Sequence, residues 1–498
     1  MSEQPAPSVK MPTSKVKSQK SDFLSRKAAS AAIFLGFKRI LIQAIFTLSN
    51  VILARALYPQ DFGTYATILF VVILFAVFTD IGFNASLIQR QGKINSKDLG
   101  SAFTFQLVLV LIVIAVINIS APLIGHFYDL GGHGVGLLRL MTIGFLFTPF
   151  KSSAGAILER RLEYKKLVTI EVLEVFFTSL TAVLMAVRGY GVTSFVVGYI
   201  VGHIVSAILY QAFSPWKIRL SFDFKRLLPH LRFGLHFQTN QISGLFFGPL
   251  IILFLSKSVG TQNLGYFQFA SGLSVLPIAF SEIVNRIAFP LGSMVQGEEK
   301  YFRGIIEKSI LVVSATTLPL VFLGLATVPE IIRLVYTDRW LVALPVVYLG
   351  FLQMIFVSYN GVFSQMLMAK GEVKTIRNMG VFWAVLTWML APVLIRQLGI
   401  VGMGITNIIV SVTGLWFWYK LHRQVEFKFL TLITPYLFGS FLSGLLALIL
   451  IQTLPLSIFS LIISLASGTL AFLIFIIVFD RENVRQSLEL VRSVIQKS

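Results

Sequence analysis

The chain has 498 residues, of which 56% are hydrophobic and only 13% charged, and its mean hydropathy is +0.81. Soluble domains carry about a quarter charged residues, so this composition excludes an ordinary soluble protein and predicts a polytopic membrane protein. The net charge of +20 arises from short Lys and Arg clusters between apolar runs, a pattern typical of membrane topology rather than of nucleic-acid binding. Without cysteine, the sequence has no disulfide, thiolate metal site or Cys nucleophile.

Residues 1–29 are polar and rich in Pro, Ser and Lys, so we expect a disordered cytoplasmic tail that is attracted to anionic lipid. Apolar runs of about 20 residues follow, which is the length that crosses a bilayer as a helix, so the expected class is all-α. Lys and Arg concentrate in alternate gaps between these runs, which places both termini, including a C-terminal tail at 481–498, in the cytoplasm. The fourteen predicted transmembrane helices span residues 30–53, 62–88, 101–125, 137–158, 166–187, 190–213, 230–256, 264–292, 304–327, 341–369, 376–396, 400–420, 429–452 and 455–479.

An internal repeat organises these helices. The stretch LARALYPQDFGTY at 53–65 recurs without gaps, 202 positions later, as LSKSVGTQNLGYF at 255–267. It joins predicted helices 1 and 2, where Asp61 is expected to cap the second helix at an outer turn. A second match, at an offset of 206, aligns Gly144-Phe145-Leu146 with Gly350-Phe351-Leu352. Duplicated units of this kind are typical of transporters.

The repeat predicts two pseudosymmetric six-helix lobes in the same orientation, because six crossings return the chain to its starting side. The N-lobe is expected at 30–229, the C-lobe at 230–428 and a pair of appended helices at 429–480. The gaps between helices are short, which excludes a soluble catalytic domain. One outer gap contains the Gly-rich run 131–136, which is expected to be a flexible connector.

Four segments resemble those of the Wzx-type polysaccharide flippases, within the multidrug/oligosaccharidyl-lipid/polysaccharide exporter superfamily. They are LARALYPQDFG, TDIG at 79–82, ERRLEYKKL at 159–167 and GYGVTSFVVG at 189–198. The resemblance implies a flippase that moves undecaprenyl-diphosphate-linked oligosaccharide across a bacterial or archaeal cytoplasmic membrane during O-antigen, lipopolysaccharide, capsule or exopolysaccharide assembly. It further implies a V of two lobes that alternates access to a central cavity, lined mainly by helices 1, 2, 7 and 8. The implied partners are lipid-linked oligosaccharide, membrane lipids and the polysaccharide polymerase and chain-length proteins.

Basic residues inside predicted helices are candidates for binding the lipid diphosphate. A charge at membrane depth costs at least about 2.5 kcal/mol, so it needs a partner, a wet cavity or a function. The candidates are Lys38 and Arg39 in helix 1, Lys151 in helix 4 and Arg286 in helix 8. Arg39 is favoured, since a guanidinium can hold a diphosphate bidentately. For Lys38 and Lys151 the alternative is that the side chain snorkels to the lipid headgroups.

Two acids, Asp80 and Glu282, occupy equivalent positions of the repeat and are candidates for gating or for coupling to H⁺ or Na⁺. Glu282 and Arg286 are four residues apart, so a simpler interpretation is that they neutralise each other on one helical face. Arg39 or Lys38 is the candidate partner of Asp80.

Further polar residues, Asn84, Asn240 and Gln241, are expected to line the cavity, and the last two are the repeat equivalents of Lys38 and Arg39. Glu171 and Glu174 lie close to Lys165 and Lys166 and are expected at the membrane interface.

No arrangement of nucleophile and base, metal ligands or cofactor motif is evident, so the function class expected is transport without catalysis. The alternatives are a multidrug or lipid II exporter of the same fold and, in a different class, a membrane polysaccharide polymerase or ligase. Such an enzyme would need a substantial periplasmic loop with catalytic polar residues, and it gives no reason for a twofold repeat.

Overall fold

The computed structural model describes residues 38–79, 96–214 and 244–481, except Ile40 and Phe247, together with the isolated positions 216, 218, 220 and 221. Helices are the only regular secondary structure in these ranges. After a first helix, Leu41–Ala56, they are α2 (Pro59–Ala76), α4 (Ser96–Phe127), α5 (Gly131–Met141), η1 (Thr142–Phe147), α6 (Thr148–Arg160), α7 (Tyr164–Val187), α8 (Thr193–Phe213), α10 (Pro249–Ser274), α11 (Ile278–Met294), α12 (Glu299–Val335), η2 (Asp338–Ala343), α13 (Leu344–Ala369), α14 (Val373–Leu398), α15 (Ile400–Thr413), α16 (Leu415–His422), α17 (Phe429–Thr453) and α18 (Ile458–Phe479).

Twelve helical spans in the described ranges are long and apolar enough to cross a membrane. The predicted all-α, multi-pass class is therefore confirmed. The count of fourteen stays a prediction, because the end of predicted helix 2 and the start of predicted helix 7 lie outside the described residues.

Predicted helix 4 is divided into α5, η1 and α6. Pro149 lies in the first turn of α6, where its missing N–H group costs nothing. The prediction of a flexible connector at 131–136 is wrong, since α5 begins at Gly131. Leu137 and Leu138 of α5 are almost fully buried, and their packing outweighs the low helix propensity of the glycines.

Predicted helices 7 and 8 are also divided differently from the expectation. The helix α10 runs through the predicted gap between them and bends at Gly260, which has a φ of +80°. Pro277 then precedes α11, which carries both Glu282 and Arg286. The charged residues predicted for helix 8 therefore lie on a separate short helix.

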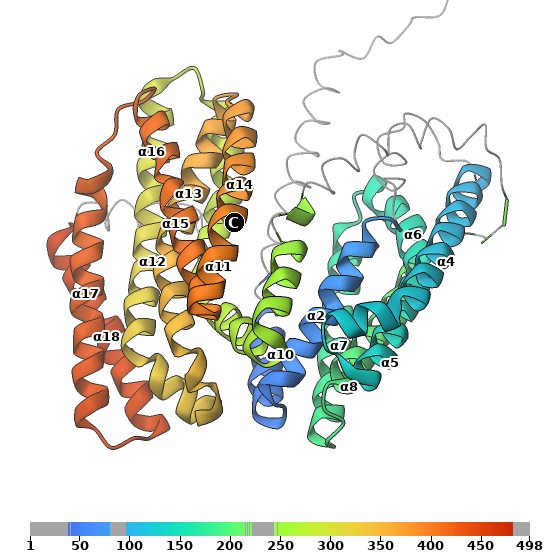
Figure 1. Ribbon diagram of the computed structural model, residues 1–498. Helices are drawn as coiled ribbons and strands as arrows, with labels where there is room; N and C mark the ends of the chain where they lie inside the picture. The colour runs from blue at the N-terminus through green and yellow to red at the C-terminus, as the bar shows by residue number, and fades with distance from the viewer. Residues whose placement is uncertain are drawn as a thin grey trace, which may run out of the picture.

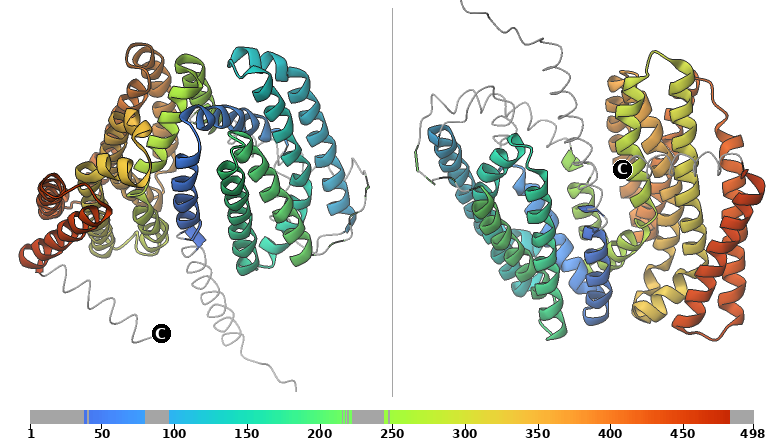
Figure 2. Two further views of the ribbon diagram at one scale, coloured as in Figure 1. Left: turned by 90° about the horizontal axis from the view of Figure 1, so that it is seen from below. Right: turned by 180° about the vertical axis from the view of Figure 1, so that it is seen from behind.

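The helices gather into two groups (Figure 1). The first helix, α2 and α4 to α8 form one group, which we call the N-lobe, and α11 to α16 form the other, the C-lobe. Two further views show the same grouping, with α10 between the two lobes (Figure 2). The helices α17 and α18 pack together and against α12, at the far side of the C-lobe. The predicted lobe boundary at 229/230 lies outside the described residues.

The two copies of the repeat pack against each other. A Cβ atom on Gly63 of α2 would lie 1.6 Å from the carbonyl oxygen of Thr261, and one on Gly265 of α10 would lie 1.8 Å from that of Pro59. These contacts are equivalent under the repeat, because Pro59 matches Thr261 and Gly63 matches Gly265. The two backbones approach so closely that only glycine fits at either position. We call this meeting of α2 and α10 the repeat contact.

Hydrogen bonds surround the repeat contact and join the two lobes. The Arg55 guanidinium donates to the carbonyl of Leu334 at 2.8 Å, and the Trp340 indole N–H donates to that of Ala54 at 2.8 Å. The hydroxyl oxygens of Thr67 and Ser256 lie 2.6 Å apart. Asp61 was expected just before the helix, but α2 begins at Pro59 and places Asp61 in its first turn. From there its carboxylate accepts the N–H of the capping residue Tyr58 at 2.9 Å. This end of the molecule is closed.

Candidate functional site

A cavity of about 580 Å³ lies beside the repeat contact, between the first helix, α2, α7, α8 and α10. Phe62 and Phe269 belong to both the contact and the cavity wall. The wall surface is mostly apolar, although about half of the lining residues carry a polar or ionisable group. The resemblance implied a central cavity lined by predicted helices 1, 2, 7 and 8. Predicted helices 1, 2 and 8 contribute to this cavity, predicted helix 7 (230–256) contributes no lining residue among the described ones, and α7 and α8 line it although they were not expected to. The polar or ionisable lining residues are Ser49, Asn50, Tyr65, Glu174, Thr178, Ser179, Tyr199, His203, Gln268 and Ser271.

Lys38 and Arg39 form ion pairs with different helices. Lys38 Nζ lies 2.5 Å from Glu171 Oε2 on α7, within the N-lobe. Arg39 Nη2 lies 2.8 Å from Glu282 Oε2 on α11, so this pair joins the two lobes. Adjacent helical residues point about 100° apart, which accounts for the two directions. Glu282 pairs with Arg39, so the alternative interpretation, in which Glu282 and Arg286 neutralise each other, does not hold; the exposed Arg286 forms no ion pair with any residue in the described ranges.

Lys151, Glu174 and His203 form a cluster at the cavity wall, contributed by α6, α7 and α8. Lys151 Nζ lies 2.6 Å from Glu174 Oε1, and His203 Nδ1 lies 3.4 Å from the same oxygen. Their side chains are only 23%, 19% and 21% exposed. The Tyr199 ring lies over the imidazole, with 4.1 Å between the ring centroids. Glu174 therefore lines the cavity, a position that the sequence did not predict for it.

The sequence analysis missed His203. Its only signal was a lone histidine in an apolar helix, and the acid that it faces is 29 positions earlier in the chain. The remaining predicted site residues, Asp80, Asn84, Asn240 and Gln241, lie outside the described residues. Within the ranges that the structure describes, no group of three or more His, Cys, Asp and Glu could hold a metal ion.

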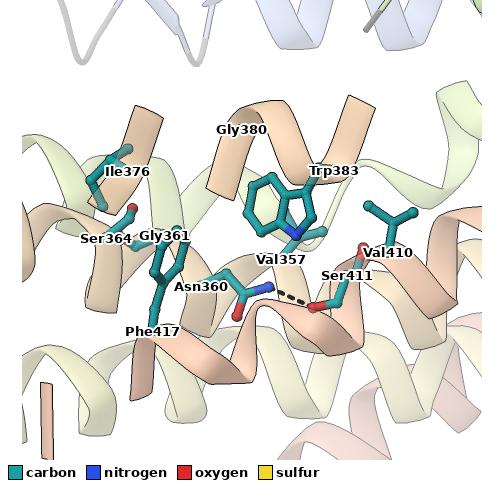
Figure 3. Close-up of a pocket in the computed structure, with 10 residues that line it drawn as sticks. All are labelled: Val357, Asn360, Gly361, Ser364, Ile376, Gly380, Trp383, Val410, Ser411 and Phe417. Atoms are coloured by element: carbon teal, nitrogen blue, oxygen red, sulfur yellow. Dashed lines mark hydrogen bonds between the residues drawn. The ribbon is translucent and has the colours of Figure 1, made fainter. Parts of the chain in front are cut away.

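A second cavity, of about 360 Å³, lies inside the C-lobe between α13, α14, α15 and α16 (Figure 3). The Asn360 amide donates to the Ser411 carbonyl at 2.7 Å in its wall (Figure 3). The Trp383 indole also lines it and donates to the Thr413 hydroxyl at 2.9 Å. Val357 and Gly380 also line this cavity.

Backbone landmarks relate the two cavities. Leu162 and Gly371 both have a positive φ, and each is followed by a Glu immediately before a helix, α7 in the N-lobe and α14 in the C-lobe. Gly191 and Gly399 also both have a positive φ, shortly before the next helices, α8 and α15. Extending these alignments without gaps identifies the C-lobe residues that are equivalent to Lys151, Glu174 and His203. The sequence match of Gly144 with Gly350, at an offset of 206, aligns Lys151 with Val357, and the two landmarks align Glu174 with Trp383 and His203 with Ser411. All three C-lobe residues line the second cavity. The equivalent sites are thus charged in one lobe and neutral in the other.

The model of a protein family described as "Polysaccharide biosynthesis protein" matches residues 52–345, from the repeat stretch to the start of α13. The chain belongs to this family. Its polysaccharide biosynthesis relatives include "Lipopolysaccharide biosynthesis protein WzxC" of Escherichia coli (strain K12), which is 23% identical over 396 residues and covers 78% of this chain and 79% of that protein. "Succinoglycan biosynthesis transport protein ExoT" of Rhizobium meliloti (strain 1021) is 22% identical over 465 residues, covering 89% and 91%. The resemblance to Wzx-type flippases is confirmed.

Among solved structures, this polysaccharide biosynthesis protein is similar to the lipid II flippase MurJ in an inward closed conformation. The TM-score is 0.75 with 16% sequence identity, over 92% of this chain and all of that one. The likeness shows that the two share a fold.

Proposed function

We propose that the chain is a flippase that moves undecaprenyl-diphosphate-linked oligosaccharide from the cytoplasmic to the outer leaflet by alternating access, without covalent chemistry. The observation that carries the proposal is the cavity beside the repeat contact, with Lys151 ion-paired to Glu174 at its wall and the Arg39–Glu282 pair joining the two lobes. A closed repeat contact at one end gives the cavity a gate. Membership of the polysaccharide biosynthesis family supports a substrate that carries a glycan.

The lipid diphosphate is the part of the substrate that charged residues can recognise. Arg39 offers a planar pair of N–H groups that matches two phosphate oxygens, while Lys38 and Lys151 offer point charges. Each of these three cations is held by an acid in the structure, namely Glu282, Glu171 and Glu174. Arg286 is exposed and completes the proposed set.

The setting of the protein is part of the proposal. The distribution of Lys and Arg supports a cytoplasmic (inner) membrane location with both termini in the cytoplasm. The polysaccharide polymerase and chain-length proteins that act on the flipped substrate are the proposed protein partners. Asp80 and Glu282 remain the proposed sites for gating or for coupling to H⁺ or Na⁺.

Expression in a strain that lacks its own flippase tests the function. We expect Arg39→Ala and Arg286→Ala each to reach the membrane but to lower surface polymer about tenfold or more, because a hydrogen bond to a charged group contributes about 1.5–3 kcal/mol. Lipid-linked oligosaccharide should accumulate on the cytoplasmic leaflet. Arg303, paired with Glu307 on α12, supplies the control Arg303→Ala, which should leave polymer output unchanged. Normal output from both test variants would remove the substrate-site assignment, and transport of lipid II or of drugs in its place would redirect the function.

A further inference from the structure

One oxygen atom of Glu174 faces two bases. Lys151 Nζ lies 2.6 Å from Glu174 Oε1, and His203 Nδ1 lies 3.4 Å from that atom. The bases come from different helices, α6 and α8, so the carboxylate can exchange one for the other without crossing the cavity. Lys151 is the closer partner in this conformation.

The Lys151–Glu174 pair conflicts with diphosphate binding. While Glu174 neutralises Lys151, the ammonium group cannot present its full charge to a second anion, and a diphosphate brought close would be repelled by the carboxylate. Removing Lys151 alone would leave Glu174 as an uncompensated, largely buried charge, which is costly. A replacement partner for Glu174 solves both problems.

Resting on the proposed function, we propose that His203 takes up one proton when the lipid diphosphate binds and replaces Lys151 as the partner of Glu174. The neutral imidazole carries its hydrogen on Nδ1, which faces Glu174, and accepts the new proton on Nε2 from water. Lys151 stays protonated and turns to the diphosphate. The site gains one proton for each substrate bound, and no covalent bond other than this N–H bond forms or breaks.

The surroundings of His203 favour this exchange. Burial disfavours a charged imidazole at His203, and so does the neighbouring charge of Lys151. The second effect ends when Lys151 moves to the anion, and the Glu174 carboxylate, 3.4 Å from Nδ1, then offsets the first by pairing with the new charge. The Tyr199 ring over the imidazole stabilises the positive ring that results. The other titratable groups that face this cluster among the described residues are Lys38 of the first helix, Glu159 of α6, Glu171 of α7 and Tyr210 of α8.

The second cavity indicates that the fold does not require these charges. Val357, Trp383 and Ser411 occupy the equivalent positions in the C-lobe and pack there without an ion pair among them. A purely structural cluster would serve both lobes alike. The charges at this place in the N-lobe therefore point to a task specific to that lobe.

The test measures binding of farnesyl diphosphate to the purified full-length protein in lipid nanodiscs, by calorimetry between pH 6.5 and 8.5. This range lies above the second ionisation of a phosphate, at about pH 6, so the ligand keeps most of its charge, and a control titration of the ligand alone corrects for the rest. We expect the wild-type Kd to fall with falling pH, by at most about tenfold per unit for one linked proton. Repeating the measurement in buffers of different ionisation enthalpy should show uptake of up to one proton.

Two variants should lose the pH dependence with opposite effects on affinity. Glu174→Gln leaves Lys151 free at every pH, so its Kd should be low throughout. His203→Gln cannot offer Glu174 a cation, so Lys151 stays paired and the Kd should be high throughout. Glu307→Gln, which removes an acid from the Arg303 pair on α12, is the matched control and should keep the wild-type pH dependence.

The outcomes separate this inference from the function on which it rests. Wild-type binding with no pH dependence, or affinity shifts of both variants in the same direction, would overturn the role of His203 and leave the flippase proposal standing. No binding of the diphosphate by the wild type at any pH would overturn both. If either variant fails to fold, the proton count of the wild type decides alone.

Discussion

Arg39 shows how an inter-lobe ion pair can be both specific and easily opened. Its guanidinium lies 2.8 Å from Glu282, but the two side chains are 44% and 32% exposed. An ion pair with that access to water contributes only about 0–1 kcal/mol. The pair therefore orients Arg39 without fixing the lobes, and a diphosphate can compete for the guanidinium.

Exchanging the charges of Arg39 and Glu282 tests whether Arg39 binds the substrate or only links the two lobes. The double variant Arg39→Glu with Glu282→Arg keeps an ion pair but removes the guanidinium from the first helix. We expect polymer output to stay about tenfold or more below wild type, because the diphosphate loses a hydrogen bond to a charged group, which contributes about 1.5–3 kcal/mol. The same exchange at Arg303 and Glu307 should have no effect on output. If the exchange of Arg39 and Glu282 restored polymer output, Arg39 would serve only to link the two lobes and would not bind the substrate.

The sequence identifies charged side chains that need a partner more readily than it identifies the partner. The cost of burying charge identified Lys38, Arg39, Lys151 and Glu282, and the structure places ion pairs at all four. A spacing of four residues shows only which side chains share a face of one helix, so it suggested Arg286 as the partner of Glu282. The actual partner, Arg39, is on another helix. Partners on other helices follow from packing, which a single sequence does not state.

The close approach of α2 and α10 makes a prediction for Gly63. A Cβ atom there would lie 1.6 Å from the Thr261 carbonyl oxygen, so Gly63→Ala must push the two helices apart. We expect the conformation open at the repeat contact to gain population by about tenfold, equivalent to about 1.4 kcal/mol.

Cysteine labelling measures that shift, because the natural chain has no cysteine. With Ser49→Cys in the cavity wall, a membrane-impermeant maleimide added from the outer side should react correspondingly faster in the Gly63→Ala background. Gly136→Ala is the control, since a Cβ atom there meets nothing within 4 Å. Equal labelling rates in the two backgrounds would show that the contact does not gate the cavity.

Long apolar helices were predictable in place, and some of them almost to the residue, although α12 (299–335) extends well beyond its predicted range of 304–327. Their interruptions were not predictable. Predicted helices at 166–187 and 429–452 correspond to α7 and α17 within about two residues, the usual uncertainty of helix ends. Apolar periodicity and length suffice for such elements. The division of predicted helix 4 and the helical Gly-rich run depend on which side chains find buried neighbours, and composition alone favoured a loop there.

Alternating access requires the whole molecule to open at the repeat contact, and a covalent link across it tests this. The hydroxyl oxygens of Thr67 and Ser256 are 2.6 Å apart on α2 and α10. The double variant Thr67→Cys with Ser256→Cys should form a disulfide on oxidation, stop transport and regain it on reduction. Each single variant should transport under both conditions. Undiminished transport by the cross-linked protein would contradict opening at this place.

The twofold organisation was visible in the sequence, but its meaning was not. The stretches at 53–65 and 255–267 were interpreted as turns that set the register of the following helices. Their mutual contact is a property of the assembled lobes, and it assigns the repeat a direct role in holding them together.

That contact has the symmetry of an isologous interface, in which each partner offers the same surface to the other. Gly63 meets Thr261 as Gly265 meets Pro59, which is the arrangement of two identical six-helix subunits in a homodimer. Joining such subunits in one chain allows their other surfaces to differ while the shared interface stays the same. An ionic cavity in one half and a neutral one in the other is an asymmetry that a homodimer cannot have.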